Sequence, residues 1–236
     1  MAEPSQIMEY LQEQFFSTRI LSGKKALVSA GPTYEPIDPV RFIGNHSSGK
    51  MGMAIARELQ ARGADVTLVL GPVKADVSLP GIVIKNVTTA EQMYEACIAS
   101  FPEADITVMA AAVADYTPVH PASEKIKKTG DSLPLELKKT KDILKSLGEL
   151  KRKNQVLTGF ALETNNEEAF ARGKLENKNA DLIVLNSLAD PGAGFGTDTN
   201  KITIFDKSGK QFDFEMKSKK AVAADIINSI SSIYYA

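Results

Sequence analysis

Short apolar runs alternate along the chain with amphipathic stretches. The apolar runs predict strands near residues 25–30, 65–70, 82–86, 105–110, 155–160 and 181–185. Apolar residues at helical spacing predict helices near residues 50–62, 89–100, 141–151, 166–178 and 218–234. This alternation is typical of an α/β fold that is Rossmann-like and doubly wound, with a mainly parallel sheet. A hairpin of residues 202–205 and 212–214 is expected to close one sheet edge before a C-terminal helix.

The chain has 236 residues, of which 43% are hydrophobic, and this is enough for one large core. We expect a single domain over residues 23–236. Residues 1–22 form a separate segment, in which Ile7, Leu11 and Phe15 fall on one face of a predicted helix. This segment is therefore interpreted as an N-terminal helical extension.

Charge and cysteine content exclude several classes of protein. The 28 Lys and Arg residues balance 29 Asp and Glu residues, which argues against a general nucleic-acid or anionic-membrane partner. The single cysteine, Cys97, excludes an internal disulfide, and its apolar neighbours favour a packing role over a nucleophilic one. Because no uninterrupted apolar run is long enough to span a bilayer, we expect a soluble, cytoplasmic protein.

The most informative segment, residues 38–52, lies between the first predicted strand and helix and reads DPVRFIGNHSSGKMG. Ser47 or Ser48 is the predicted N-cap of that helix. The free backbone N–H groups of the first turn then point at whatever lies above Gly49, which predicts an anion-binding site. Gly44 and Gly49-Lys50 have Walker A spacing, but Met51 replaces the required Ser or Thr, and the loop begins more than ten residues after its strand.

Two later segments have the composition of ligand-binding loops. Four alanines among residues 110–114 allow a ligand to approach the backbone, with the Asp115 carboxylate at the rim, although alanines there could equally pack against a helix. Residues 117–133 show no clear period and contain Lys125, Lys127 and Lys128. A stretch of this length without regular structure is typical of a segment that moves or binds a ligand. A solvated charge run is the alternative.

Four motifs together carry a resemblance to a known family. Residues 31–52, 110–116, 124–128 and 159–165 resemble, in order and spacing, bacterial phosphopantothenate–cysteine ligase (phosphopantothenoylcysteine synthetase). That enzyme is usually fused behind a flavin-dependent phosphopantothenoylcysteine decarboxylase. Residues 2–7 resemble the tail of the decarboxylase, so residues 1–22 are either a native helical extension or a remnant of that domain.

The resemblance implies a reaction and its participants. CTP would activate the carboxylate of 4′-phosphopantothenate as an acyl cytidylate, with release of pyrophosphate. The amine of L-cysteine would then displace CMP, a step of coenzyme A biosynthesis. The family uses Mg²⁺, which would offset phosphate charge, and forms a homodimer with sites near the dimer interface. A phosphopantothenoylcysteine decarboxylase domain is the expected partner in the native full-length protein.

The resemblance also implies roles for particular residues. Asn45, Arg41 and Lys125 are the expected catalytic residues. Ser48, Gly49 and Lys50 are expected to bind the substrate phosphate. The expected nucleotide-binding residues are Ala111, Ala112, Ala114, Asp115, Lys125, Asp142, Ile143, Phe160, Lys174 and Lys178. One position departs from the family, which often has Asn-Pro-Asp-Ile where this chain has Thr140-Lys141-Asp142-Ile143.

Several alternatives stay open at the level of sequence. Asp115 could contact a ribose hydroxyl or a metal ion, and Lys174 with Lys178 could bind phosphate or stabilise the negative end of a helix. A nicotinamide-dependent reductase would share the architecture, but the first turn lacks its glycine fingerprint. A non-catalytic regulatory subunit would also keep the fold, yet Asn45 and Lys125 are both present.

Overall fold

The structure is a computed structural model that describes residues 19–74, 77–128, 131–163, 167–187 and 196–235. The predicted N-terminal helix lies outside these residues, as does most of a glycine-rich loop near residue 194. Leu21, at the predicted domain boundary, is fully buried in the core. None of the helices in the described part of the chain is both long enough and apolar enough to cross a membrane.

The centre of the molecule is an eight-stranded sheet with the order β13-β12-β10-β9-β6-β1-β4-β5. Its parallel strands are β1 (Lys25–Ala30), β4 (Asp65–Leu70), β5 (Val83–Asn86), β6 (Ile106–Met109), β9 (Val156–Glu163) and β10 (Leu182–Ser187). Read from β5 to β10, their chain order is 3-2-1-4-5-6, the Rossmann order, in which the direction of winding reverses between β1 and β6. The predicted mainly parallel, doubly wound sheet is confirmed.

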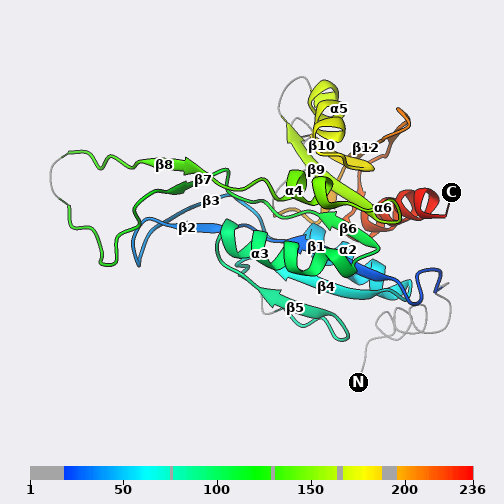
Figure 1. Cartoon of the computed structure of the whole chain (residues 1–236), viewed down its shortest axis with the longest axis horizontal. Helices are drawn as coiled ribbons and strands as arrows, with labels where there is room; N and C mark the ends of the chain where they lie inside the picture. Colours follow the sequence, from blue (N-terminus) through cyan, green and yellow to red (C-terminus); the bar gives the residue numbers. More distant parts are fainter. Residues whose placement is uncertain (1–18, 75–76, 129–130, 164–166, 188–195, 236) are drawn as a thin grey trace.

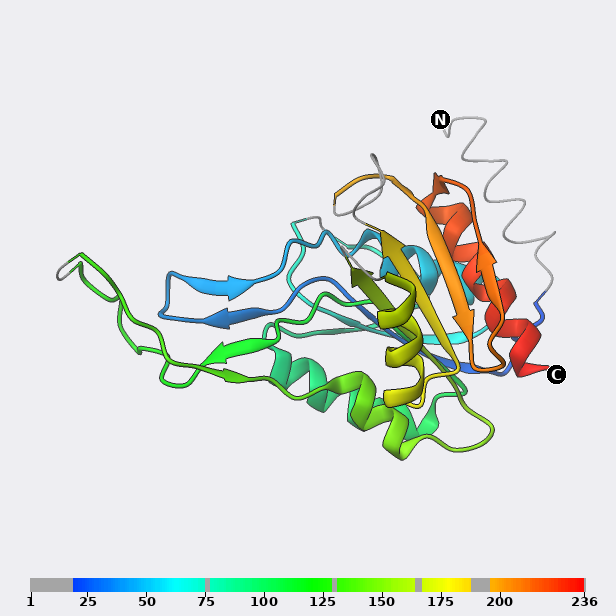
Figure 2. The same cartoon turned by 90° about the horizontal axis from the view of Figure 1, so that it is seen from above.

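Helices cover both faces of the sheet. On one face α2 (Lys50–Ala61) and α6 (Lys219–Tyr234) pack together, and on the other lie α3 (Ala90–Ser100), α4 (Ile143–Leu150) and α5 (Glu167–Asn177), as Figures 1 and 2 show. Each layer encloses its own apolar cluster, because successive side chains of a strand point to opposite faces. Cys97 is fully buried in the second cluster, and burial raises the pKa of its thiol to about 12, so its predicted packing role is confirmed.

The predicted C-terminal hairpin is also present. β12 (Ile202–Asp206) pairs antiparallel with both β10 and β13 (Gln211–Asp213), so the hairpin closes one edge of the sheet. Before it, β11 (Thr199–Asn200) pairs with β14 (Lys217–Ser218), which leads directly into α6. The 3-10 turn η2 (Phe101–Glu103) connects α3 to β6.

An arm that the sequence analysis did not predict projects away from the sheet (Figures 1 and 2). It consists of two antiparallel hairpins, β2 (Tyr34–Pro36) with β3 (Phe42–Gly44) and β7 (Tyr116–Pro118) with β8 (Leu137–Lys139). The described part of the predicted structureless stretch, residues 117–128 and 131–133, runs along this arm. Its first two residues, Thr117 and Pro118, are paired with β8, whereas the sequence shows no periodicity there.

Candidate functional site

Two adjoining cavities open at the carboxyl ends of the parallel strands, the edge where ligands bind in doubly wound sheets. The first has a volume of about 650 Å³ and lies over the N-terminus of α2. The second, of about 510 Å³, lies over the N-terminus of α4. They share a wall formed by Ala111, Val113, Asp115, Phe160 and Lys174. Two ligands can therefore lie side by side at the edge of the sheet where the direction of winding reverses, between β1 and β6.

The loop into α2 forms one side of the first cavity. Gly49 is the N-cap, with a φ of 71° that other residues rarely adopt, and a Cβ there would lie 3.0 Å from Val73 Cγ1. The predicted N-cap role of Ser47 or Ser48 is therefore wrong, because the sharp entry turn requires glycine. Ser47 instead accepts a hydrogen bond from the Gly49 N–H at 3.3 Å. Ser48, Gly49 and Lys50 all line the cavity, so the expected phosphate-binding residues lie together.

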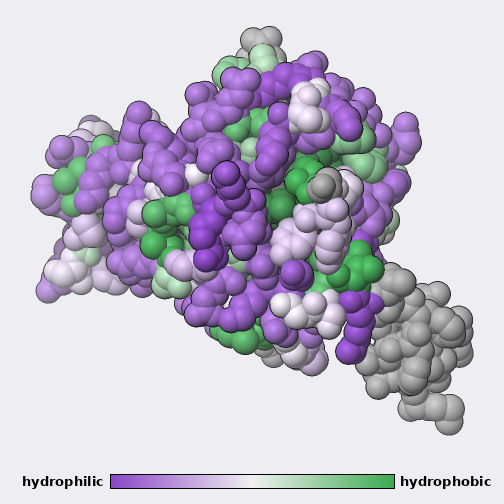
Figure 3. Space-filling model, turned by 45° about the vertical axis from the view of Figure 1, so that its right-hand side comes forward, coloured by the Kyte–Doolittle hydropathy of each residue, from purple (hydrophilic) through white to green (hydrophobic). Residues whose placement is uncertain are grey.

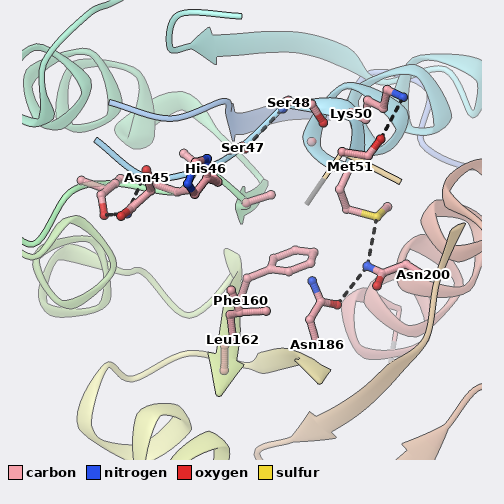
Figure 4. A pocket seen from close by; sticks show the side chains of 18 of the residues that line it. Asn45, His46, Ser47, Ser48, Lys50, Met51, Phe160, Leu162, Asn186 and Asn200 are labelled. Carbon is pink, nitrogen blue, oxygen red and sulfur yellow. Dashed lines mark hydrogen bonds between the residues drawn. The ribbon is translucent and has the colours of Figure 1, made fainter. Parts of the chain in front are cut away.

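Asn45 stands at the junction between this loop and the alanine-rich segment. Its Nδ2 donates to the Val113 carbonyl at 2.9 Å and lies 3.4 Å from the Ala112 carbonyl. In Figure 4, Asn45 and His46 lie on one side of the cavity, and Phe160 and Leu162 from β9 lie across from them. The amide of Asn45 is thus fixed by the backbone beside the shared wall.

The end of the first cavity nearest α6 is polar, and of its residues only Lys50 was expected from the sequence. Asn200, buried to 2% exposure, donates to Asn186 Oδ1 at 3.0 Å (Figure 4). Lys50 donates to Asp198 at 2.6 Å, and the buried side chain of Lys219 also lines the cavity. Asn186 lies near the end of β10, Asn200 ends β11, and Lys219 begins α6. No periodicity in the sequence distinguishes these polar residues from surface residues.

The second cavity is built around the N-terminus of α4. Asp142 is the N-cap and accepts hydrogen bonds from the Lys145 N–H at 2.9 Å and from Lys178 Nζ at 2.5 Å. Partial burial works to raise the pKa of Asp142, but the hydrogen bonds from Lys178 and Lys145 outweigh it and lower the pKa. Lys174 donates to the Phe160 carbonyl at 2.7 Å. Lys174 in the last turn of α5 and Lys178 directly after this helix therefore both contact residues that line this cavity.

Most of the residues that the resemblance assigned to the nucleotide surround these cavities. One or both cavities are lined by Ala111, Ala112, Asp115, Asp142, Ile143, Phe160 and Lys174. Ala114 is buried behind the wall, where its carbonyl accepts from the hydroxyl of Thr140 at 2.7 Å. Although Thr140 departs from the family pattern, it lines the second cavity and fixes the alanine-rich segment.

Arg41 and Lys125 lie in the arm and do not line either cavity in the single chain. Asp38, whose side chain is fully buried, accepts from the N–H groups of Val40 (2.8 Å), Arg41 (2.9 Å) and Ile126 (3.1 Å). Arg41 donates to the Ile126 carbonyl at 2.6 Å. Asp38 thus holds the lysine-rich segment against the β2–β3 hairpin. Burial works to raise the pKa of Asp38, but these backbone donors lower it overall.

Among the described residues there is no group of three or more His, Cys, Asp and Glu side chains that could hold a metal ion on its own. This donor set still fits Mg²⁺ brought by a nucleotide, because such ions are usually held by one or two carboxylates together with substrate phosphates and water. Asp115, which lines both cavities, supplies one such carboxylate.

The strand order and the cavities at the switch point define a Rossmann-type α/β protein with a ligand site at the carboxyl edge of its sheet. The model of the DNA/pantothenate metabolism flavoprotein C-terminal domain matches residues 21–234, and the chain belongs to this family. The solved C-terminal domain of a coenzyme A biosynthesis bifunctional protein CoaBC is 40% identical and has a TM-score of 0.78. That alignment covers 92% of this chain and 98% of the solved domain.

Two longer relatives are also similar over the whole chain. The coenzyme A biosynthesis bifunctional protein CoaBC of Vibrio parahaemolyticus is 43% identical over 99% of this chain, which spans 58% of that protein. A protein of an unknown prokaryotic organism, named cysteine/cysteine sulfinic acid decarboxylase, is 50% identical over 100% of this chain, which spans 67% of it. The chain thus corresponds to little more than half of the CoaBC protein and two thirds of the other.

Proposed function

We propose that this chain is the CTP-dependent ligase that joins 4′-phosphopantothenate to L-cysteine in coenzyme A biosynthesis. The observation that carries the proposal is the pair of adjoining cavities with a shared wall, one over the N-terminus of α2 and the other over that of α4. A ligation of this kind must hold a nucleotide and an acid so that they meet. The CoaBC relatives support the pathway.

The chemistry has two balanced steps. A carboxylate oxygen of 4′-phosphopantothenate attacks the α-phosphorus of CTP, the bond to the β-phosphate oxygen breaks, and pyrophosphate leaves. The cysteine nitrogen then attacks the acyl carbonyl, loses a proton, and expels CMP as the amide forms. A free carboxylate is a poor electrophile, so the first step supplies the leaving group that the second step uses. The protein contributes mainly by positioning its substrates and offsetting their negative charge.

Residues of the shared wall suit this sequence of steps. Phe160 and the alanine-rich backbone offer an apolar face and fixed hydrogen-bonding groups to the cytosine, while Lys174 and Lys178 offset triphosphate charge beside α4. The Asn45 amide, held by the Val113 carbonyl, orients the acyl group for attack by the amine. The N-terminus of α2, from Ser48 to Lys50, takes the phosphate of the acid substrate. Mg²⁺ bound with the nucleotide would neutralise further phosphate charge, with Asp115 as its protein ligand.

A homodimer is part of this proposal, because Arg41 and Lys125 lie outside the cavities of their own chain. The arm exposes apolar side chains over both of its hairpins, namely those of Val40, Phe42, Tyr116, Leu133, Leu135 and Leu137. Apolar patches interrupt the hydrophilic surface toward the arm's end of the molecule (Figure 3). Exposed apolar patches of this kind mark interaction sites. Pairing two arms would cover these side chains and bring Arg41 and Lys125 toward a partner's cavity.

The test is to supply substrates one at a time. With CTP and 4′-phosphopantothenate, the protein should release pyrophosphate and form an acyl cytidylate detectable by mass spectrometry. Added L-cysteine should convert this intermediate to 4′-phosphopantothenoylcysteine and CMP. ATP should support much slower turnover, and equal rates with both nucleotides would contradict the CTP preference. Release of CO₂ from L-cysteine without CTP would instead support a decarboxylase such as the 50% identical relative is named for, and NAD binding in preference to CTP would support a reductase.

A further inference from the structure

Lys219 is a buried lysine in the wall of the first cavity. It is the first residue of α6, which Ser218 caps, and its exposed fraction is 8%. Its Nζ donates to the Thr197 carbonyl in the loop before β11. Lysine is rarely buried to this extent, because the ammonium group loses its hydration. The buried ammonium group nevertheless belongs to a side chain that lines the cavity, where a ligand can reach it.

Further positive charge lies close to Lys219. The N-terminus of a helix carries partial positive charge, and the first turn of α6 contains no acidic residue. Burial lowers the pKa of Lys219, the nearby charge of Lys50 lowers it further, and Asp198 acts in the opposite direction. An anion bound at this end of the cavity would be attracted by both lysines and by the helix N-terminus.

Lys50 and Lys219 occupy equivalent positions on neighbouring helices. Each is the first residue of its helix, α2 and α6 pack against each other, and both lysines line the first cavity. Figure 2 shows the two helices side by side on one face of the sheet. Two positive helix ends and two lysine side chains therefore converge on one end of the cavity.

Among the residues that the structure describes, Asp198 is the carboxylate in contact with Lys50. Asp198 Oδ1 accepts from Lys50 Nζ at 2.6 Å, and the Asp198 side chain is 87% exposed. The backbone carbonyl of Asp198 also accepts from the Lys219 N–H at 2.9 Å. An exposed carboxylate on a surface loop is weakly held, and a phosphate with more charge and more acceptor oxygens competes well for the same lysine.

We propose that Lys219 and Lys50 together bind a phosphate group of the substrate over the N-terminus of α2, and that this phosphate displaces Asp198 from Lys50. The inference rests on the proposed function, because it assumes that a phosphorylated substrate enters the first cavity. The shared chemistry is a phosphate ester or anhydride. The triphosphate tail of CTP and the phosphate of 4′-phosphopantothenate are its two sources. Lys219 is then a binding residue for the ligation that acts together with the α2 loop.

The experiment measures binding without turnover, by calorimetry with inorganic tripolyphosphate, CTP and 4′-phosphopantothenate separately. Lys219→Gln should lower the affinity for at least one of these ligands by about tenfold or more, as expected for loss of a charge-assisted hydrogen bond. Lys219→Arg should restore much of the affinity. Lys220→Gln is the matched control, since Lys220 is the next residue of α6 and is exposed. Asp198→Asn should change affinity in the opposite direction, tightening binding several-fold.

The ligand whose binding is weakened identifies the source of the phosphate. Loss of tripolyphosphate and CTP affinity assigns the triphosphate tail, and loss of 4′-phosphopantothenate affinity alone assigns the phosphate of the acid. Unchanged binding of all three, or an equal effect of Lys220→Gln, overturns the proposal. If Lys219→Gln does not fold, Asp198→Asn decides, because unchanged or weaker binding there contradicts displacement. A wild-type protein that binds these ligands through Lys219 but ligates nothing would refute the proposed function and leave this inference standing.

Discussion

The sheet with its helices and the arm are stabilised in different ways. In the sheet, strands such as β1 and β6 are almost entirely buried, and two apolar clusters hold the helices in place. In the arm, three-residue strands pair in two small hairpins, and the buried Asp38 carboxylate holds the segments together through backbone N–H groups. The cavities belong to the rigid part, while two predicted catalytic residues belong to the arm. Stability and catalysis should therefore respond to different substitutions.

The largest expected effect is on the sheet. A Cβ added at Gly52 would lie 2.5 Å from Ala30 Cβ and 2.9 Å from the Ser29 carbonyl, so α2 can approach β1 only through glycine. Gly52→Val should lower the free energy of unfolding by about 3 kcal/mol, as overpacking of a tight core does. Urea denaturation measures this value. Gly173→Ala, at an open position in α5, is the control and should be neutral or stabilising. Equal stability of both variants would show that α2 can shift freely.

A substitution in the arm should affect catalysis and leave stability nearly unchanged. Lys125→Gln should lower the rate of pyrophosphate release by about a hundredfold, because a charge that stabilises the transition state of the first step is removed. The melting temperature should hardly change, since Lys125 is exposed. Lys127→Gln serves as a control in the same segment. Normal release by Lys125→Gln would make this segment a solvated charge run.

The two chemical steps are separated by a change at the shared wall. Asn45→Asp keeps the size of the side chain but replaces the amide donor with a negative charge beside an anionic intermediate. Pyrophosphate release should persist and the acyl cytidylate should accumulate, while product formation with L-cysteine falls by about a hundredfold. Mass spectrometry of the intermediate and product distinguishes the steps. Parallel loss of both steps would mean that Asn45 holds the loop or the nucleotide instead.

A smaller effect is expected at Asp38, whose carboxylate holds the lysine-rich segment against the β2–β3 hairpin. Asp38→Asn removes the charge that three backbone N–H groups approach, which should lower the free energy of local opening by about 1–2 kcal/mol. Hydrogen exchange should accelerate at Ile126 and Val40, while the amides of β1 and β6 keep their protection. Acceleration throughout the sheet would show that arm and core unfold as one unit.

The smallest effect concerns pH. The pKa of Asp38 is lower in the folded protein than its ordinary value of 3.8, so the ionised carboxylate stabilises the folded arm, in which it accepts its backbone hydrogen bonds. Its contribution is complete above that ordinary value and is lost as the pH falls through the lower folded pKa. NMR should show the amides of Arg41 and Ile126 shifting below about pH 4, and Asp38→Asn should abolish this titration. Shifts centred near pH 6 would implicate a different group.

The difference between the two regions also explains what could be predicted from the sequence. Helix and strand periodicity arises from burial against a core, so the strands of the central sheet and the five helices that cover it were predicted close to their observed bounds. β2 and β3 are too short to show alternation, and β2 ends in Pro36. Their geometry depends on Asp38, whose role is visible only when Ile126 is folded beside it.

The site was predictable to the extent that its residues follow strands of the sheet. Asn45, Asp115 and Phe160 lie at the carboxyl edge, as such positions in a Rossmann order imply. Lys219 was missed because two adjacent lysines at the start of a helix look like a solvated end, and only the packing of α6 on α2 places one of them in the cavity. The N-cap at Gly49 was missed because two neighbouring serines matched the usual capping preference.

The packing of α6 on α2 has a consequence for biosynthesis. Residues far apart in the chain meet on α6, where Arg62 at the end of α2 donates to Asn228 at 2.7 Å and Lys24, before β1, lies over the ring of Tyr234. A ribosome that has translated the chain as far as β13 has synthesised every strand of the central sheet but has not yet supplied α6, which packs with α2 on one face and carries Lys219. The first cavity is therefore complete only after residues 219–234 have been synthesised, and a chain without α6 would lack both the cover of this face and the charge of Lys219.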